Sequence, residues 1–281
     1  MKLAAYIKFT LFCTWITLNI PTFIVSSVLP QNLRPYVLRY IMITLGGIIG
    51  IRARKIGQVS KDRPLMLTCN HIGWVELFAF PMVMKLSFFG KAEIAKWPLV
   101  GWAVKSLGVV FVDRRPSQAM TAVANVNATM KRANYPVALF PEGTTSNGSY
   151  VKEFKSSLFS IVNFDNPNIT IQPVVQVWKY RNGKLIDDKT LANHYAYFNN
   201  DAVEYGPKAD INDRSGVALA LDIMGRGGLL VDYYFLKPID LNGIKDRKEL
   251  AKKLQKIIAD KYSELRDNRV IIPKMSSNQS L

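Results

Sequence analysis

Residues 65–76 read LMLTCNHIGWVE, a mostly apolar segment followed by a polar turn. Its first five residues are mostly apolar, with Thr68 as the one hydroxyl residue, which is typical of a short buried strand. Asn70 and His71 follow directly, and Glu76 leads into a second apolar run that predicts a helix. The carboxyl end of a strand is where α/β proteins usually place a site. The stretch therefore predicts a strand, a polar turn and a helix, with the turn as a candidate site.

His71 and Glu76 are a candidate catalytic pair. A histidine can accept the proton of an attacking hydroxyl, and a carboxylate on its other ring nitrogen fixes the tautomer and stabilises the imidazolium. Five residues along a helix turn by about 140° at roughly 100° per residue, so the two side chains would not share a face. The pairing therefore requires His71 at or before the helix start, which Asn70 and Gly73 favour. The alternative is a structural histidine that caps the helix.

The rest of the chain after residue 61 alternates between short β-rich runs and amphipathic stretches, which predicts an α/β domain. A long charged helix is expected near the C-terminus, and the polar tail after it is expected to fray. The predicted strands are residues 65–69, 86–89, 108–112, 137–140, 169–177 and 229–236, and the predicted helices are 93–106, 117–133, 154–163 and 246–266.

A second polar segment, FPEGTTSNG at residues 140–148, also follows a predicted strand. Two glycines and three hydroxyl residues would let backbone amides approach an anion or an oxyanion closely. An ordinary polar turn is the alternative. Glu142 argues against that alternative, because a carboxylate at a strand end needs a partner if it is even partly buried.

A third set of polar residues, GKAE at 90–93 and VDRR at 112–115, brings cations to the ends of neighbouring predicted strands. Phosphate recognition uses such groups. Solvated surface charges are the alternative.

The N-terminal part predicts a membrane anchor. Residues 9–33 carry no charge, and about 20 such residues suffice to span the hydrocarbon as a helix. A cleaved signal peptide is the rival, but the run is long and a second apolar segment, residues 40–51, follows it. Pro21 should kink or break the first helix. Two geometries stay open, a spanning helix followed by an interfacial one, and a helical hairpin that dips into one leaflet.

The charge of the chain suits an anionic membrane face or an anionic substrate. Its 281 residues include 37 Lys and Arg against 21 Asp and Glu, and no acidic residue precedes Asp62. The basic groups flank apolar runs rather than forming a solvated stripe, so no nucleic-acid partner is expected. Cys13 and Cys69 are the only cysteines, and no disulfide is expected between them. With only His71 and His194 besides, no metal site is expected.

Taken in order, these segments resemble the glycerophospholipid acyltransferases, especially the bacterial 1-acyl-sn-glycerol-3-phosphate acyltransferases. Four blocks match over about residues 60–260. The family's His-x4-Asp block is met at 71–76, and its second block at 91–114. Its Phe-Pro-Glu-Gly-Thr block is met at 140–144, and its apolar block containing proline at 171–174.

The resemblance implies a mixed sheet flanked by helices and a known chemistry. His71 would deprotonate the acceptor hydroxyl, which attacks an acyl thioester, with Glu76 orienting the imidazole and no covalent acyl-enzyme. The donor would be acyl-CoA or acyl carrier protein, with no other cofactor. The acceptor would be a lysophospholipid, 1-acyl-sn-glycerol-3-phosphate, giving phosphatidic acid. The residues assigned to the acceptor site are Lys91, Arg114, Glu142, Gly143, Thr144, Thr145 and Lys155.

The resemblance also implies a location and a domain plan. The enzyme would dock on the lipid bilayer at the cytoplasmic face of the bacterial inner membrane. Residues 1–60 would be membrane-anchoring helices, 61–268 the acyltransferase domain, and 269–281 a flexible tail.

Two positions depart from the family pattern. Glu76 stands where the family usually has aspartate, so a shift of the helix must absorb one methylene or catalysis is weakened. Thr145 stands where many members that use lysophosphatidic acid carry arginine. Relatives that acylate lyso-ornithine lipid often have threonine there, so that lipid is the alternative acceptor.

Two other classes of protein compete with the acyltransferase reading. A non-catalytic membrane lipid-binding protein would keep the fold without acyl transfer. A serine hydrolase is disfavoured because the chain has no Gly-x-Ser-x-Gly motif.

Overall fold

The computed structural model describes residues 2–91, 100–112, 135–164, 168–195 and 216–266. Seven strands within these residues form one sheet in the order β1-β7-β6-β2-β5-β3-β4. Neighbouring strands are parallel except β6 and β7, which are antiparallel. The strands are β1 (Ile51–Ile56), β2 (Leu65–Cys69), β3 (Ser87–Lys91), β4 (Val110–Val112), β5 (Val137–Leu139), β6 (Thr170–Tyr180) and β7 (Leu229–Phe235). The predicted mixed α/β architecture is confirmed.

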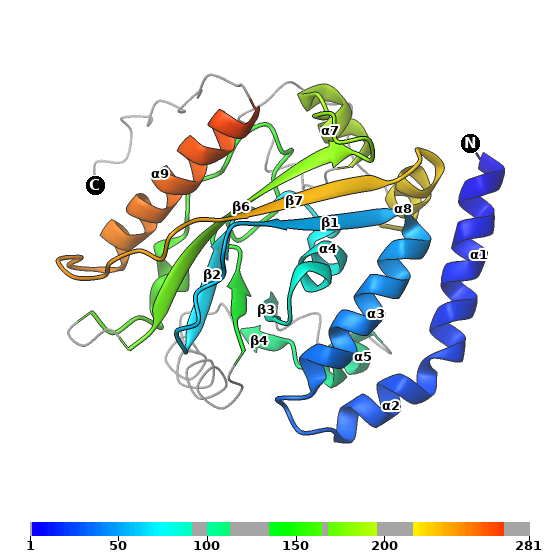
Figure 1. The fold of residues 1–281 in the computed structure, drawn as a ribbon, viewed down its shortest axis with the longest axis horizontal. Coiled ribbons are helices and arrows are strands. Elements are labelled where there is room, and N and C mark those ends of the chain that lie inside the picture. The colour runs from blue at the N-terminus through cyan, green and yellow to red at the C-terminus, as the bar shows by residue number, and fades with distance from the viewer. Residues whose placement is uncertain (1, 92–99, 113–134, 165–167, 196–215, 267–281) are drawn as a thin grey trace, which may run out of the picture.

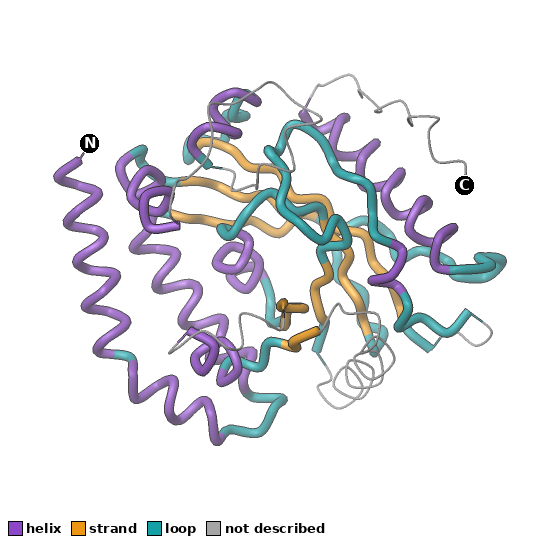
Figure 2. The backbone as a smooth tube through the Cα atoms, turned by 180° about the vertical axis from the view of Figure 1, so that it is seen from behind, coloured by secondary structure: helices purple, strands orange, loops and turns teal. Residues whose placement is uncertain are grey.

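Helices cover the sheet on both sides (Figures 1 and 2). The N-terminal helices lie together on one side of the molecule, and α9 lies on the opposite side. On the first side α3 packs against α4 and β1, while on the other side α9 packs against β6. The helices are α1 (Lys2–Leu18), α2 (Ile20–Val28), α3 (Arg34–Ile49), α4 (Glu76–Val83), α5 (Val100–Ser106), α7 (Asp188–His194), α8 (Gly216–Gly225) and α9 (Arg247–Arg266).

The first apolar run is divided, as Pro21 predicts. Helix α1 ends at Leu18, and α2 begins at Ile20 with Pro21 in its first turn, where proline is tolerated. The axes of the two helices differ by 44°. No single described helix has the length and apolar character of a membrane span, whereas the bent pair of α1 and α2 has both.

Strand β1 was not predicted. Its sequence IRARKI mixes apolar and basic residues and follows α3 without a polar loop. The strand pairs with β7 alone at the edge of the sheet, so most of its side chains stay exposed. The helices of the N-terminal part therefore end at Ile49, and residues 51–56 belong to the sheet.

The predicted helix over residues 154–163 was wrong. Only a 3-10 turn, Ser156–Phe159, forms there. The backbone amide of Lys155 donates to the carbonyl of Pro141, and that of Lys152 donates to Glu142, which holds the preceding segment extended. The helix predicted for residues 117–133, part of that for 93–106 and the tail 269–281 lie outside the described residues.

A buried ion cluster joins three strands of the sheet. Asp232 on β7 is fully buried and accepts hydrogen bonds from Arg54 on β1 at 2.7 and 2.8 Å. Lys179 on β6 lies 2.8 Å from the same carboxylate. Burial raises the pKa of Asp232, but the bonds and charges of the two cations outweigh it and hold the pKa below its ordinary value.

Candidate active site

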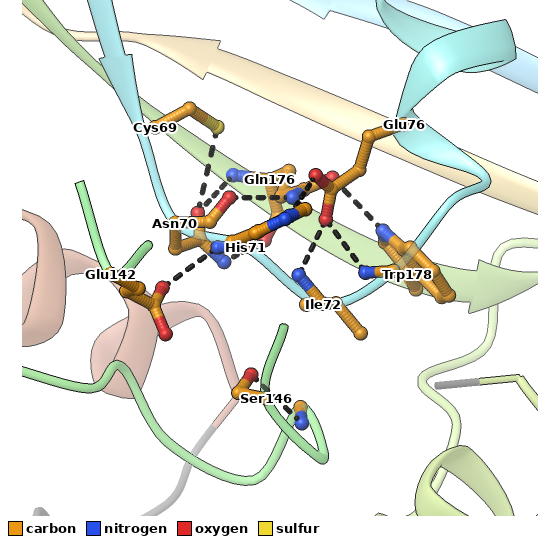
Figure 3. A network of polar contacts seen from close by, with 11 residues as sticks. Cys69, Asn70, His71, Ile72, Glu76, Glu142, Ser146, Gln176 and Trp178 are labelled. Atoms are coloured by element: carbon orange, nitrogen blue, oxygen red, sulfur yellow. Dashed lines mark hydrogen bonds and ion pairs between the residues drawn. The ribbon is translucent and has the colours of Figure 1, made fainter. Parts of the chain in front are cut away.

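The candidate site lies where β2 and β5 end. The two strands are parallel neighbours, so the turn after Cys69 and the loop after Leu139 emerge side by side. Each motif was predicted to follow a strand, and the pairing of β2 with β5 brings the two together. Figure 3 shows the ring of His71 between Glu76 and the side of the site that carries Glu142.

Glu76 is the first residue of α4, and His71 precedes the helix, as the pairing requires. One carboxylate oxygen lies 2.6 Å from Nδ1 of His71. The other accepts hydrogen bonds from the backbone amides of Ile72 and Gly73. The Glu76 residue is fully buried, so the turn that carries His71 folds around this carboxylate. The additional methylene relative to aspartate is accommodated in this arrangement.

The His71 side chain remains partly accessible. It is 24% exposed and stacks on Phe140 at 4.7 Å between ring centroids. Because Nδ1 is occupied by Glu76, Nε2 is the nitrogen available to a substrate. A carboxylate at Nδ1 favours the tautomer with the proton on Nδ1, which leaves Nε2 as an acceptor.

Asn70 fixes the end of β2 onto β6. Its side-chain oxygen accepts from the backbone amide of Gln176 at 2.9 Å, and the side-chain amide of Gln176 donates to the carbonyl of Asn70 at 2.6 Å. Trp178 in turn donates to the side-chain oxygen of Gln176 at 3.0 Å. This buried network extends the ladder between the strands by one residue and holds the backbone that enters the His71 turn (Figure 3).

Glu142 joins the two motifs through the backbone. One carboxylate oxygen accepts from the amide of His71 at 2.7 Å, and the other accepts from the amide of Lys152 at 3.1 Å. The amide of Ser146 donates to the carbonyl of His71 at 2.8 Å. Burial raises the pKa of Glu142 to about 8, although the hydrogen bonds that the two backbone amides donate lower it. The partner expected for a buried carboxylate is thus the His71 turn itself.

Comparison with known proteins identifies the domain that carries this site. The family described as Acyltransferase matches residues 50–177, which include both motifs. The chain carries an acyltransferase domain. It is 27% identical over 219 residues to Lyso-ornithine lipid O-acyltransferase of Rhodobacter capsulatus, a match that covers 77% of this chain and 71% of that protein.

Two further comparisons agree with this acyltransferase domain. The 1-acyl-sn-glycerol-3-phosphate acyltransferase of Neisseria meningitidis is 29% identical over 107 residues, which is 37% of this chain and 42% of that protein. The crystal structure of the 1-acyl-sn-glycerophosphate acyltransferase PlsC from Thermotoga maritima superposes with a TM-score of 0.62 at 18% identity, covering 96% of this chain and 99% of that chain. The predicted enzyme class, acyltransferase, is confirmed, and so is the predicted fold.

Two lysine side chains lie beside the loop of residues 140–148. The exposed Lys155 side chain crosses Gly143, where an added Cβ would meet its Cδ at 2.8 Å. Lys152 donates from Nζ to the carbonyl of Thr145 at 2.9 Å. Thr144 and Thr145 are partly exposed on this loop. Lys152 was not singled out from the sequence, because its contact with Thr145 depends on the path of the loop.

The other predicted acceptor residues are less completely described. Lys91 ends β3, which neighbours β5, so its backbone lies at the same edge of the sheet as the site. Its side chain and the whole of Arg114 lie outside the described part. Within the described part, no group of three or more His, Cys, Asp or Glu side chains is arranged to hold a metal ion.

Proposed function

We propose that this acyltransferase moves a fatty acyl group from a thioester donor to the free hydroxyl of a lysolipid, with His71 as the general base. The observation that supports this role is the placement of the ring, with Nδ1 paired to buried Glu76 at 2.6 Å, Nε2 left for a substrate and the side chain 24% exposed. A base oriented in this way by a carboxylate has the arrangement that activation of a hydroxyl requires.

The reaction follows in two steps. Nε2 of His71 takes the proton of the acceptor hydroxyl as its oxygen attacks the thioester carbonyl carbon. The tetrahedral intermediate then collapses, the carbon–sulfur bond breaks, and the leaving thiolate takes the proton from the imidazolium. Glu76 stabilises that imidazolium between the two steps. The acyl group goes directly from donor to acceptor, without a covalent acyl-enzyme.

The donor we propose is acyl-CoA or acyl carrier protein, with no other cofactor. The cellular location we propose for the enzyme is the bilayer surface at the cytoplasmic face of the bacterial inner membrane. Exposed apolar side chains on α1 and α2 support membrane contact, since Leu3, Leu18 and Val28 are 75%, 73% and 81% exposed.

Two acceptors follow from different observations. The resemblance in the sequence motifs favours 1-acyl-sn-glycerol-3-phosphate, with phosphatidic acid as product. The Rhodobacter capsulatus relative, whose match covers 77% of this chain, and Thr145 in the loop favour lyso-ornithine lipid. For either lipid we assign the head-group site to Lys91, Arg114, Gly143, Thr144, Thr145 and Lys155, while Glu142 supports the site through its bonds to the backbone.

A matched pair of histidine variants tests the proposal. Detergent-solubilised full-length protein is incubated with labelled acyl-CoA or acyl carrier protein and, in parallel, with each lysolipid. His71→Ala should abolish product. His194→Ala is the control, because His194 is the other histidine of the chain and pairs with Asp222 at 2.9 Å outside the site.

The possible results separate the alternatives. Product on one lysolipid, lost only in His71→Ala, supports the mechanism and identifies the acceptor. Turnover that survives His71→Ala removes His71 as the base. Absence of product with both acceptors and both donors would instead favour a non-catalytic lipid-binding protein.

A further inference from the structure

A second polar site lies at the opposite end of β2 from His71. A cavity of about 800 Å³ opens between the start of α3, the end of β1, the end of α4 and the residues that precede β2 and β5. Strand β2 separates it from the catalytic turn by five residues of about 3.3 Å each. The cavity is therefore not part of the site described above.

The cavity is strongly basic. Five cationic side chains line it, and no acidic residue is among its described lining residues. The acid nearest in sequence, Asp62, accepts a hydrogen bond from the hydroxyl of Ser60, and its charge acts on Arg63 without forming an ion pair. The five cations are Arg39, Lys55, Lys61, Arg63 and Lys85.

Neutral partners hold three of these cations in place. Arg39 donates to the carbonyl of Met82 at 3.2 Å, and Arg63 donates to the carbonyl of Ser60 at 3.0 Å. Lys85 donates to the hydroxyl of Tyr36 at 2.8 Å and lies 4.0 Å from the centre of its ring. In the described part of the chain, none of the five cations forms an ion pair with a carboxylate. Their charge is therefore available to an anion.

One wall of the cavity continues into an exposed apolar strip. Leu33 and Tyr36 line the cavity and are 41% and 55% exposed. Tyr40 and Ile43 follow four and seven residues after Tyr36, on the same face of α3, and are 50% and 43% exposed. A ligand bound here would meet positive charge at one end and an apolar surface at the other.

We propose that this basic cavity binds the phosphate head group of an anionic phospholipid of the bilayer, with the apolar strip of α3 facing the acyl chains. Guanidinium and ammonium groups recognise phosphate oxygens through charge-assisted hydrogen bonds. Clusters of such groups beside a membrane-contacting helix favour anionic lipid surfaces. A soluble phosphate compound would match the charge but would leave the adjoining apolar strip exposed.

The test compares vesicle binding by full-length wild type and Lys55→Gln/Lys61→Gln. Both lysines are exposed and have no described side-chain bonds, so the fold should tolerate the change. Vesicles of phosphatidylcholine alone and vesicles that also contain phosphatidylglycerol are titrated and bound protein is separated by flotation. The charge-matched control is Lys248→Gln/Lys252→Gln, two exposed lysines on α9 at the other side of the molecule (Figure 1).

We expect the wild type to prefer vesicles with phosphatidylglycerol. The affinity of the cavity variant for these vesicles should be roughly tenfold lower, which removes the preference. The control should change by less than about threefold, because its lysines lie away from the cavity. Arg39→Gln/Arg63→Gln should repeat the loss. The proposal fails if the control loses as much as both cavity variants, which would indicate only net charge. It also fails if cavity variants bind both vesicles normally but no longer bind free CoA in calorimetry, which would indicate a soluble ligand.

Discussion

Glu76 holds His71 from one side only, with one carboxylate oxygen 2.6 Å from Nδ1 and the other bound to the amides of Ile72 and Gly73. The same carboxylate therefore sets both the ring and the backbone turn that carries it. The orientation of the proposed base depends on the length and the charge of this one side chain, and each can be changed separately.

Removing the charge of Glu76 should abolish most activity. In Glu76→Gln the side-chain oxygen can still accept from the amides of Ile72 and Gly73, but its amide group would then face Nδ1 as a donor. That arrangement favours the tautomer with the proton on Nε2, which cannot act as a base. We expect kcat to fall by about 10³- to 10⁴-fold, while substrate binding changes little.

The measurement for Glu76→Gln is steady-state kinetics with whichever lysolipid the wild type acylates. Glu264→Gln, an exposed position on α9, serves as the control and should retain wild-type kinetics. If Glu76→Gln kept turnover within twofold of wild type, Glu76 would have no orienting role.

Shortening the same side chain should also impair the enzyme. In Glu76→Asp the carboxylate cannot reach Nδ1 and the two amides together without a shift of α4, which is packed against α3. We expect kcat to fall by about 10- to 100-fold, because a displacement near 1 Å is enough for such losses. Circular dichroism and thermal unfolding separate this effect from misfolding. Wild-type kcat in Glu76→Asp would show that the helix adjusts freely.

Glu142 should make stability depend on pH. Its folded pKa is raised to about 8 from an ordinary value of 4.5, so between these values the unfolded chain has lost the proton and the folded chain retains it. The contribution of Glu142 to stability therefore falls as pH rises across this window. Glu142→Gln removes the titration, so we expect the unfolding free energy of wild type relative to the variant to decrease from pH 5 to pH 8.

Chemical denaturation of both proteins at several pH values measures that difference for Glu142. Glu153→Gln, at an exposed position further along the chain, controls for the general effect of losing a carboxylate and should show no such trend. A wild-type minus Glu142→Gln difference that stays flat across the window would mean that Glu142 is already ionised in the folded protein.

Asp232 should contribute strongly to stability. Asp232→Asn removes a fully buried charge and leaves Lys179, whose side chain is only 16% exposed, without its carboxylate partner. We expect a loss of about 3 kcal/mol in unfolding free energy. Because the folded pKa of Asp232 is lowered, its contribution in wild type is present above its ordinary pKa and is lost as pH falls through the folded pKa.

Denaturant titration of Asp232→Asn checks this expectation. Its control is Asp260→Asn, which breaks the exposed pair with Lys256 at 2.7 Å and should cost less than about 0.5 kcal/mol. Equal losses in the two variants would contradict a special role for the buried cluster.

The sequence predicted the parts of this protein whose signal is local. Residues 65–69 are apolar except for Thr68, and β2 is found as predicted. His71 could be placed before the helix because five residues do not bring two side chains onto one helical face. The sequence also placed the His71 turn and the loop 140–148 at strand ends, where α/β proteins usually carry their sites, but that the two meet is known only from the pairing of β2 with β5.

Other features depend on contacts between distant residues. Gln176 lies inside an apolar strand, and its role appears only when the register of β2 with β6 puts it beside Asn70. Lys152 reaches Thr145 because the loop turns back on itself. The sequence of β1 is that of an exposed amphipathic segment, and it is a strand because it pairs with β7, which lies far along the chain.

A methyl group at Gly148 should displace the loop that holds His71. Gly148 has φ +80°, and an added Cβ would lie 2.4 Å from Cδ2 of Leu191 and 3.2 Å from Ile72. Gly183 has φ +88° but no atom within 4 Å of that position. Both Gly→Ala variants carry the same backbone strain of about 1 kcal/mol, so their difference isolates the steric clash.

We expect Gly148→Ala to lose a further 1–3 kcal/mol or so in unfolding free energy compared with Gly183→Ala. Its activity should fall as well, because Ile72 adjoins His71 and its amide binds Glu76. Parallel denaturant titrations and rate measurements test both effects. If the two alanine variants were equally stable and equally active, Leu191 and Ile72 would have room to move, and the packing of this loop would not position the catalytic turn.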